Sequence, residues 1–450
     1  MNRIKSALVS IRSSLWFVPS IMVVASIGLA LTLVEMDQRF QWGLPDTLPL
    51  LFGAGAEGSR GMLSTIAGSM ITIAGLTFSL TIAALATAST QYTSRVLRNF
   101  MRDRPNQLVL GCFVGIFAYC LVVLRTVRGE AEGLFVPSLA VFAALLLALL
   151  GIGVLVFFIH HIAASIQAST IIRAITDESL AVVERAFPSP CSDEPACEQP
   201  LEALREFPGD PAWQAVLSPA RGYVQDVDAA QLVRIAEERD AIVRLDVEPG
   251  VFAAVDSPLL SVAAIRPIDE SVRAKLCACV SIERFRTIDQ EPGFGIRQLV
   301  DIALKALSPG INDTTTAAMC IEHLGAVLAQ CAPRDMPTCH RARDGRVRVI
   351  TRGPSFADLT NAAFDEIRRN AAKNATVIER MMRALGFIAS RTSRSDRRLI
   401  LEQHLRLVVD LADRTIDVAH DRAGIERALA AALQAFAGDR PAWAAALGAP

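Results

Sequence analysis

Charged side chains are absent from four long stretches in the first third of this 450-residue sequence. None of them contains Asp, Glu, Lys or Arg, and they are residues 15–34, 62–88, 108–124 and 136–159. A transmembrane helix needs about 20 mostly apolar residues, and the third stretch is at the lower edge of that range. The sequence therefore predicts a bundle of four transmembrane helices and excludes a wholly soluble protein.

Recognisable catalytic patterns are also missing. The sequence has no G-x-S-x-G, G-x-x-x-x-G-K, H-E-x-x-H or G-x-G-x-x-G pattern, so it offers no evidence for an enzyme of those classes. The nine cysteines have no regular spacing. Cys277 and Cys279 could share a metal, but a closed site needs four ligands and no partner motif is present. Buried thiols are the favoured interpretation, and we expect neither a metal nor a cofactor.

A net charge of −1 points to no polyanionic partner, because the arginines are interleaved with acids. We therefore expect no nucleic acid partner. The first apolar stretch follows a basic terminus, as in a signal peptide, but it is longer than a typical signal core and three more stretches follow. Residues 1–14 predict a basic interfacial segment, with a frayed terminus as an equally open alternative.

Cations on the flanks of the apolar stretches predict their orientation. The basic flanks contain Arg3, Lys5 and Arg12 before the first stretch, and Arg95, Arg98, Arg102 and Arg104 after the second. Because arginine and lysine are retained on the cytoplasmic side, both termini are expected in the cytoplasm of a bacterial cell, with the helices in the inner (plasma) membrane. Seven of the nine cysteines follow residue 190, which fits a reducing compartment.

The second stretch is unusually polar for a membrane span. Thr65, Ser69, Thr72 and Ser79 lie close to one stripe of seven-residue spacing, and Gly68 and Gly75, seven residues apart, form a neighbouring stripe. Small and hydroxyl residues commonly serve helix packing, which is one interpretation. The other is a hydroxyl-lined pathway, since hydroxyls can replace part of the hydration shell of an ion. The four hydroxyl residues are thus candidates for lining a pore.

The loop after this stretch is basic and amphipathic. Its four arginines, Arg95, Arg98, Arg102 and Arg104, fall between apolar residues of one helical face. Such a segment is expected to bind anionic lipid headgroups. In an oligomer the same arginines could surround the inner mouth of a pore and favour anions.

Residues 168–450 predict a cytoplasmic α+β domain, whereas residues 15–167 form the transmembrane domain. A proline-rich acidic loop is expected at 188–211. Strands are expected at 222–227, 241–247 and 259–264, an edge strand at 346–351, and helices elsewhere, including 271–284.

A sharp turn interrupts the helical pattern near residue 310. Ser308, Pro309 and Gly310 end one helix, and Asn312 or Asp313 caps the next. We expect a self-satisfied helix cap, although a free helix N-terminus could also hold an anion.

Two segments, "SRVLRNFMRDRPNQLVLGCFVGIFAYCLVVLR" and "FGIRQLVDIALKALSPGINDTTTA", resemble the domain-of-unknown-function 2254 family of bacterial membrane proteins. The family turn usually reads S-P-G-I-N-D-P-x-T-A, and Thr314 stands here in place of its proline. The resemblance implies four spans and a cytoplasmic C-terminal domain. It implies no activity, substrate or catalytic residue.

These features lead to two functional expectations. The first is an oligomeric channel or transport-like protein whose cytoplasmic domain regulates it. The alternative is a membrane-anchored scaffold or sensor without transport, in which the hydroxyl stripe packs against the first or third span of the same chain. An enzyme ranks third.

Overall fold

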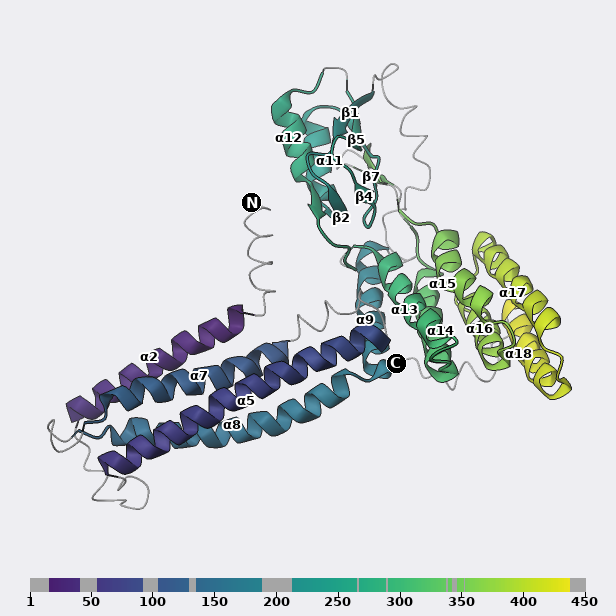
Figure 1. The fold of residues 1–450 in the computed structure, drawn as a ribbon. Helices are drawn as coiled ribbons and strands as arrows, with labels where there is room; N and C mark the ends of the chain where they lie inside the picture. Colours follow the sequence, from purple (N-terminus) through teal and green to yellow (C-terminus); the bar gives the residue numbers. More distant parts are fainter. Residues whose placement is uncertain are drawn as a thin grey trace. The chain divides into compact units, whose positions relative to one another are not determined.

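The computed structural model describes residues 16–40, 55–91, 104–128, 135–187, 213–264, 267–288, 290–336, 339–341, 346–351 and 353–437. The chain divides into two units, Met1–Thr170 and Ile171–Pro450. The first contains long apolar helices, and the second combines helices with two sheets (Figure 1). The predicted fold class, a membrane helical bundle followed by an α+β region, is confirmed.

Four helices of the first unit are long and apolar enough to cross a membrane. They are α2 (Phe17–Phe40), α5 (Ala56–Gln91), α7 (Arg104–Thr126) and α8 (Ser138–Ser165). Helix α7 contacts the other three helices. Half of its most apolar segment is buried, compared with 17–22% of the corresponding segment in each of the other helices. The shortest predicted span is therefore the central helix of the bundle.

Two glycines allow α2 to approach α7 closely. A Cβ added at Gly111 would lie 2.6 Å from the Sδ of Met22 and 3.0 Å from the Cα of Pro19. A Cβ added at Gly115 would lie 2.7 Å from the Oγ of Ser26. The Gly111-x-x-x-Gly115 pattern thus acts as a close-packing site between helices.

Replacing Gly111 with isoleucine should destabilise the bundle by about 1–3 kcal/mol, because the added side chain has no space beside α2. The loss should appear as a lower unfolding midpoint in detergent. Gly153→Ile on α8 is the matched control, since a Cβ there meets nothing within 4 Å. Equal losses of stability in the two variants would show that Gly111 is not a close-packing site between α2 and α7.

Polar contacts join the helices at one end of the bundle. The carboxylate of Asp37 near the end of α2 accepts hydrogen bonds from the amides of Leu139 (3.0 Å) and Ala140 (3.1 Å) at the start of α8. The hydroxyl of Tyr119 on α7 donates to the carbonyl of Ala140 at 2.8 Å. The two amides are among those that the start of a helix leaves unpaired, so Asp37 caps α8.

The second unit contains two sheets. One has the strand order β1-β5-β3-β8-β7 and the other β4-β2-β6. The strands are β1 (Trp213–Leu217), β2 (Gly222–Val227), β3 (Ile242–Leu245), β4 (Phe252–Ala253), β5 (Pro258–Ala263), β6 (Val280–Glu283), β7 (Cys339–Arg341) and β8 (Val347–Ile350). Their shared core includes side chains from both sheets and from helices α11 (Ala229–Glu238) and α12 (Glu270–Ala278).

Two expectations for this region are wrong. The helix predicted over 271–284 ends at Ala278, because Val280–Glu283 pairs with β2 as strand β6. The strand predicted at 346–351 is not at an edge: β8 lies between β3 and β7. Pairing with distant strands decided both outcomes, and local periodicity does not contain that information.

The remaining helices stack in two rows (Figure 1). One row holds α13 (Pro292–Ala306), α15 (Phe356–Asn370) and α17 (Ser395–Thr415), and the other holds α14 (Thr314–Cys331), α16 (Ala375–Ala389) and α18 (Ala419–Ala437). Helix α9 (Ala168–Ala186) lies beside the array, where the Oγ1 of Thr176 and the Nδ1 of His323 on α14 are 2.9 Å apart. Stacked helix pairs of this kind bury a continuous core.

Candidate functional site

Helix α5 has two faces of different character. Its inner face packs against α7 and α8 and is mostly apolar, although Ser59 and Thr77 are also buried. The buried residues on this face include Leu63, Ile66, Ala67, Met70 and Ala74. Its outer face is exposed and holds the hydroxyl residues that the sequence identified as pore-lining candidates.

The four candidate hydroxyls share this outer face, and each bonds to its own helix. Thr65 donates to the carbonyl of Gly61 at 2.8 Å, and Ser69 donates to that of Thr65 at 2.8 Å. The hydroxyls of Thr72 and Ser79 continue this pattern, with donor–acceptor distances of 2.8 and 2.9 Å. All four side chains are exposed, so the expectation that the stripe packs against another span of the same chain does not hold.

A repeat underlies this face. The pairs Gly61/Thr65, Gly68/Thr72 and Gly75/Ser79 each follow the pattern Gly-x-x-x-Ser/Thr, and they recur every seven residues. A Cβ placed at any of the three glycines would meet nothing within 4 Å. We call residues 61, 65, 68, 69, 72, 75 and 79 the small-residue face. The sequence alone placed the glycines and the hydroxyl residues on two neighbouring stripes. Their shared seven-residue period shows that the two stripes form one face.

The predicted cluster of arginines is only partly described. Arg95, Arg98 and Arg102 lie outside the described residues, as do the predicted basic segment 1–14 and the loop 188–211. Arg104 is exposed at the first position of α7. The assignment of these arginines to a pore mouth or to lipid headgroups stays a prediction.

The turn after α13 is internally hydrogen-bonded. Asp313 caps α14 by accepting from the amide of Thr316 at 3.0 Å and from its hydroxyl at 2.5 Å. These bonds, the side-chain bond first, lower the pKa of the Asp313 carboxyl. Asn312 has a positive φ of 49° and precedes the cap. The amide of Asp313 donates to the carbonyl of Ala306 at 2.8 Å, which closes the corner.

Its neighbours hold the turn in place. The hydroxyl of Ser308 donates to the carbonyl of Lys305 at 2.6 Å. Thr314, in place of the usual family proline, accepts from the side-chain amide of Asn374 at 3.0 Å. Pro309 and Gly310 are exposed at the tip. The arrangement is that of a helix–helix corner, and its carboxylate at the helix start takes the place an anion would occupy.

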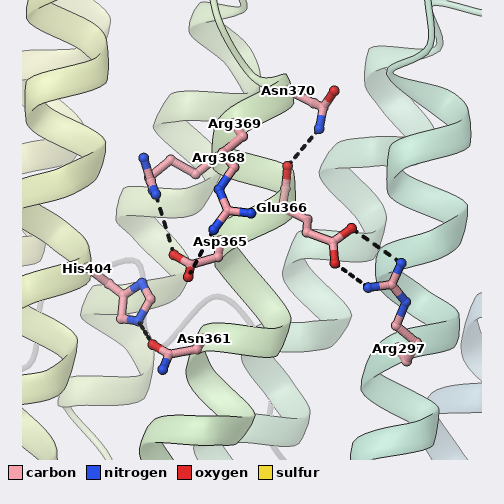
Figure 2. A network of polar contacts seen from close by, with 8 residues as sticks. All are labelled: Arg297, Asn361, Asp365, Glu366, Arg368, Arg369, Asn370 and His404. Atoms are coloured by element: carbon pink, nitrogen blue, oxygen red, sulfur yellow. Dashed lines mark hydrogen bonds and ion pairs between the residues drawn. The ribbon is translucent and has the colours of Figure 1, made fainter.

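A polar network crosses one row of the helical array (Figure 2). Arg297 on α13 pairs with Glu366 on α15 and with Asp301 at 2.8 Å. On the other side of α15, Asn361 lies 2.9 Å from the Nε2 of His404 on α17. Burial lowers the pKa of His404, and its contact with Asn361 is a hydrogen bond between helices. The network holds α13, α15 and α17 together.

Thiol chemistry is unfavourable at three cysteines that the structure describes in this unit. Burial raises the pKa of Cys279 and of Cys331 to about 12, and it raises that of Cys277. A thiol with a raised pKa is a poor nucleophile and a poor metal ligand. Over the residues that the structure describes, no group of three or more His, Cys, Asp or Glu side chains could hold a metal ion.

Four helices that are long and apolar enough to cross a membrane, followed by a mixed helical and sheet unit, are the features of an integral membrane protein. The model of the DUF2254 family, described as predicted membrane proteins, matches residues 12–386, and the chain belongs to this family. Uncharacterized proteins of Mycobacterium bovis and Mycobacterium tuberculosis are 32% identical over 441 residues, covering 96% of this chain and 83% of theirs. No solved structure matches.

Proposed function

We propose that this protein is an oligomeric, channel- or transport-like protein of the bacterial inner membrane. In this proposal several copies place α5 toward a shared axis, both termini are cytoplasmic, and the C-terminal unit regulates the assembly. One observation carries the proposal: the small-residue face points away from its own bundle. The proposal includes no catalytic step and no cofactor.

The exposed surface of α8 provides the contrast. The outward residues of α8 include Leu146, Leu149, Ile152 and Val156, all large and apolar. Such a surface suits acyl chains. Glycine and hydroxyl side chains suit acyl chains less, because they offer little apolar area for packing. Association with another copy would cover them.

The seven-residue period supports one packing geometry. Helices that meet along a seven-residue repeat wind about each other with a left-handed crossing near 20°. From Gly61 to Ser79 the face extends over about 27 Å at 1.5 Å per residue. That length matches a hydrocarbon core of about 30 Å. One α5 face can therefore follow a shared axis across the membrane.

The hydroxyl oxygens of the small-residue face determine which groups could bind along such a path. Each donates its hydrogen to its own helix and keeps lone pairs that can accept from water or contact a cation. Arginines at the inner mouth would favour anions instead. A measurement of ion selectivity would decide whether the hydroxyl oxygens or the arginines dominate. If the arginines lie outside the path, they would bind anionic lipid headgroups instead.

Purified protein in planar bilayers should conduct ions above the background of empty lipid. The double variant Thr72→Val with Ser79→Ala removes two hydroxyl oxygens that could accept a contact from the ion or its water. If each contact contributes about 1 kcal/mol, each loss should lower the conductance roughly fivefold. Thr32→Val on α2 is the matched control, because Thr32 is exposed and donates in the same way to Gly28 at 2.6 Å. Wild-type protein that passes no ion would overturn the channel proposal.

A scaffold or sensor without transport is the second candidate. The observation in its favour is that each hydroxyl hydrogen is already bonded within α5. Glycine faces also allow helices to pack so closely that no path remains. This candidate predicts assembled protein without conductance, so the bilayer experiment separates the two.

A further inference from the structure

The outer side of the three-stranded sheet gathers aromatic side chains. Tyr223 on β2 is directly opposite Phe252 on β4 and Glu283 on β6. Because side chains alternate along a strand, these three share one side, and the neighbouring Gly222, Val224 and Ala253 face the core. We call Tyr223, Phe252 and Phe285, together with the exposed neighbours Arg221 and Arg284, the aromatic face.

Contacts hold two pairs of residues on this face. The rings of Tyr223 and Phe252 meet edge to face with centroids 5.4 Å apart. Phe285 follows β6, and its carbonyl accepts from the side-chain amide of Gln225 at 2.6 Å. The guanidinium of Arg284 lies 5.3 Å from the centroid of the Phe285 ring. The face is therefore held in place by the sheet.

This ordered face remains open to solvent. Phe252 is 53% exposed and Phe285 is 52% exposed, and Val255 in the adjoining turn is 53% exposed. Opposite them, Val224 and Ala253 are almost completely buried. Large apolar side chains that an ordered sheet leaves exposed commonly mark a place of interaction.

Composition and attachment favour a lipid surface as the occupant. Aromatic rings and arginines together suit the membrane interface, where rings enter the apolar boundary and guanidinium groups reach the headgroups. Glu283 is opposite Tyr223 on the same side of the sheet, and its carboxylate does not favour a polyanion such as nucleic acid. The unit is covalently joined to four spans, which keeps a bilayer within its reach at high effective concentration.

We propose that the aromatic face docks the C-terminal unit onto the bilayer in which the chain is embedded. Phe252 and Phe285 insert at the headgroup boundary, Tyr223 lies between them, and the two arginines contact phosphates. This docking does not depend on conduction, because a scaffold could use it in the same way. It also gives the C-terminal unit a means to respond to the state of the membrane.

The full-length protein in vesicles of mixed zwitterionic and anionic phospholipid tests this proposal. A photoactivatable p-benzoylphenylalanine replaces Phe252 or Phe285 in separate preparations, because it is close to phenylalanine in shape. The control position is Leu399 on α17, which is 55% exposed and lies on the helical array. Unchanged elution and protease resistance establish that each preparation is folded.

Light should produce lipid adducts at positions 252 and 285 and far fewer at 399. Arg221→Gln with Arg284→Gln should reduce the adducts by up to about fivefold per arginine. Cross-links between two copies at 252 or 285 would overturn the proposal and identify a second chain as the occupant. Equal lipid labelling at all three positions, adducts with another macromolecule, or no adducts at 252 and 285 would also overturn it.

Discussion

Replacing Gly68 and Gly75 with leucine should convert the assembled protein into single copies. Each leucine adds a bulky side chain to the small-residue face, and overpacking costs about 1–3 kcal/mol per site at every contact between copies. The single bundle should stay folded, because a Cβ at either glycine meets nothing within 4 Å in its own chain. The readout is the mass of the detergent-solubilised protein by light scattering.

Gly153→Leu is the control for this double change. Gly153 lies on α8 and is equally open within one chain, so leucine adds the same bulk on a different outward surface. It should leave the assembled mass unchanged. If Gly153→Leu disperses the copies and the α5 variant does not, the copies meet through α8 and the small-residue face lies against lipid.

Arg397→Met should give the second large effect, a loss of about 3 kcal/mol in the stability of the C-terminal unit. Arg397 is 3% exposed, and its Nη1 donates to the carbonyls of Cys331 (2.8 Å) and Ala332 (2.6 Å) at the end of α14. Methionine fills a similar volume but leaves both buried carbonyls without these donors. Burial lowers the pKa of Arg397, yet the guanidinium stays charged, so the cap operates across the physiological pH range.

Thermal or denaturant unfolding of the full-length protein measures this loss. Arg406→Met on the same helix is the control, because its guanidinium is exposed and its contact with Glu402 is 3.9 Å long. Exposed pairs of that kind contribute about 0–1 kcal/mol. A small effect for Arg397→Met would mean that α14 does not depend on α17 for its C-terminal cap.

Local chemistry made the membrane unit predictable from sequence. Runs without charge identify spans because lipid cannot solvate charges, and backbone bonding there must be internal. The cap at Asp313 was predictable for a similar reason, since it uses neighbours three residues away. Strand β6 was not, because the helical pattern at 271–284 is interrupted by pairing with Tyr223 and its neighbours on β2.

The candidate site was predictable in part. The residue types on α5 identified Thr65, Ser69, Thr72 and Ser79, but only the packing of α7 and α8 against the other side shows that they face outward. The bond between His404 and Asn361 and the cap made by Arg397 join positions 43 to 66 residues apart. Helical periodicity does not specify side-chain partners so far apart in the sequence, and known catalytic or binding motifs do not specify them either.

Cross-linking at the centre of the small-residue face tests the central claim most directly. Thr72→Cys, in native membranes treated with a mild oxidant, should form a disulfide between two copies, because the same face of each α5 meets its counterpart. Leu150→Cys on the exposed surface of α8 should not form one. A strong cross-link at position 150 with none at 72 would contradict the account, since the small-residue face would then lie against lipid and line no path.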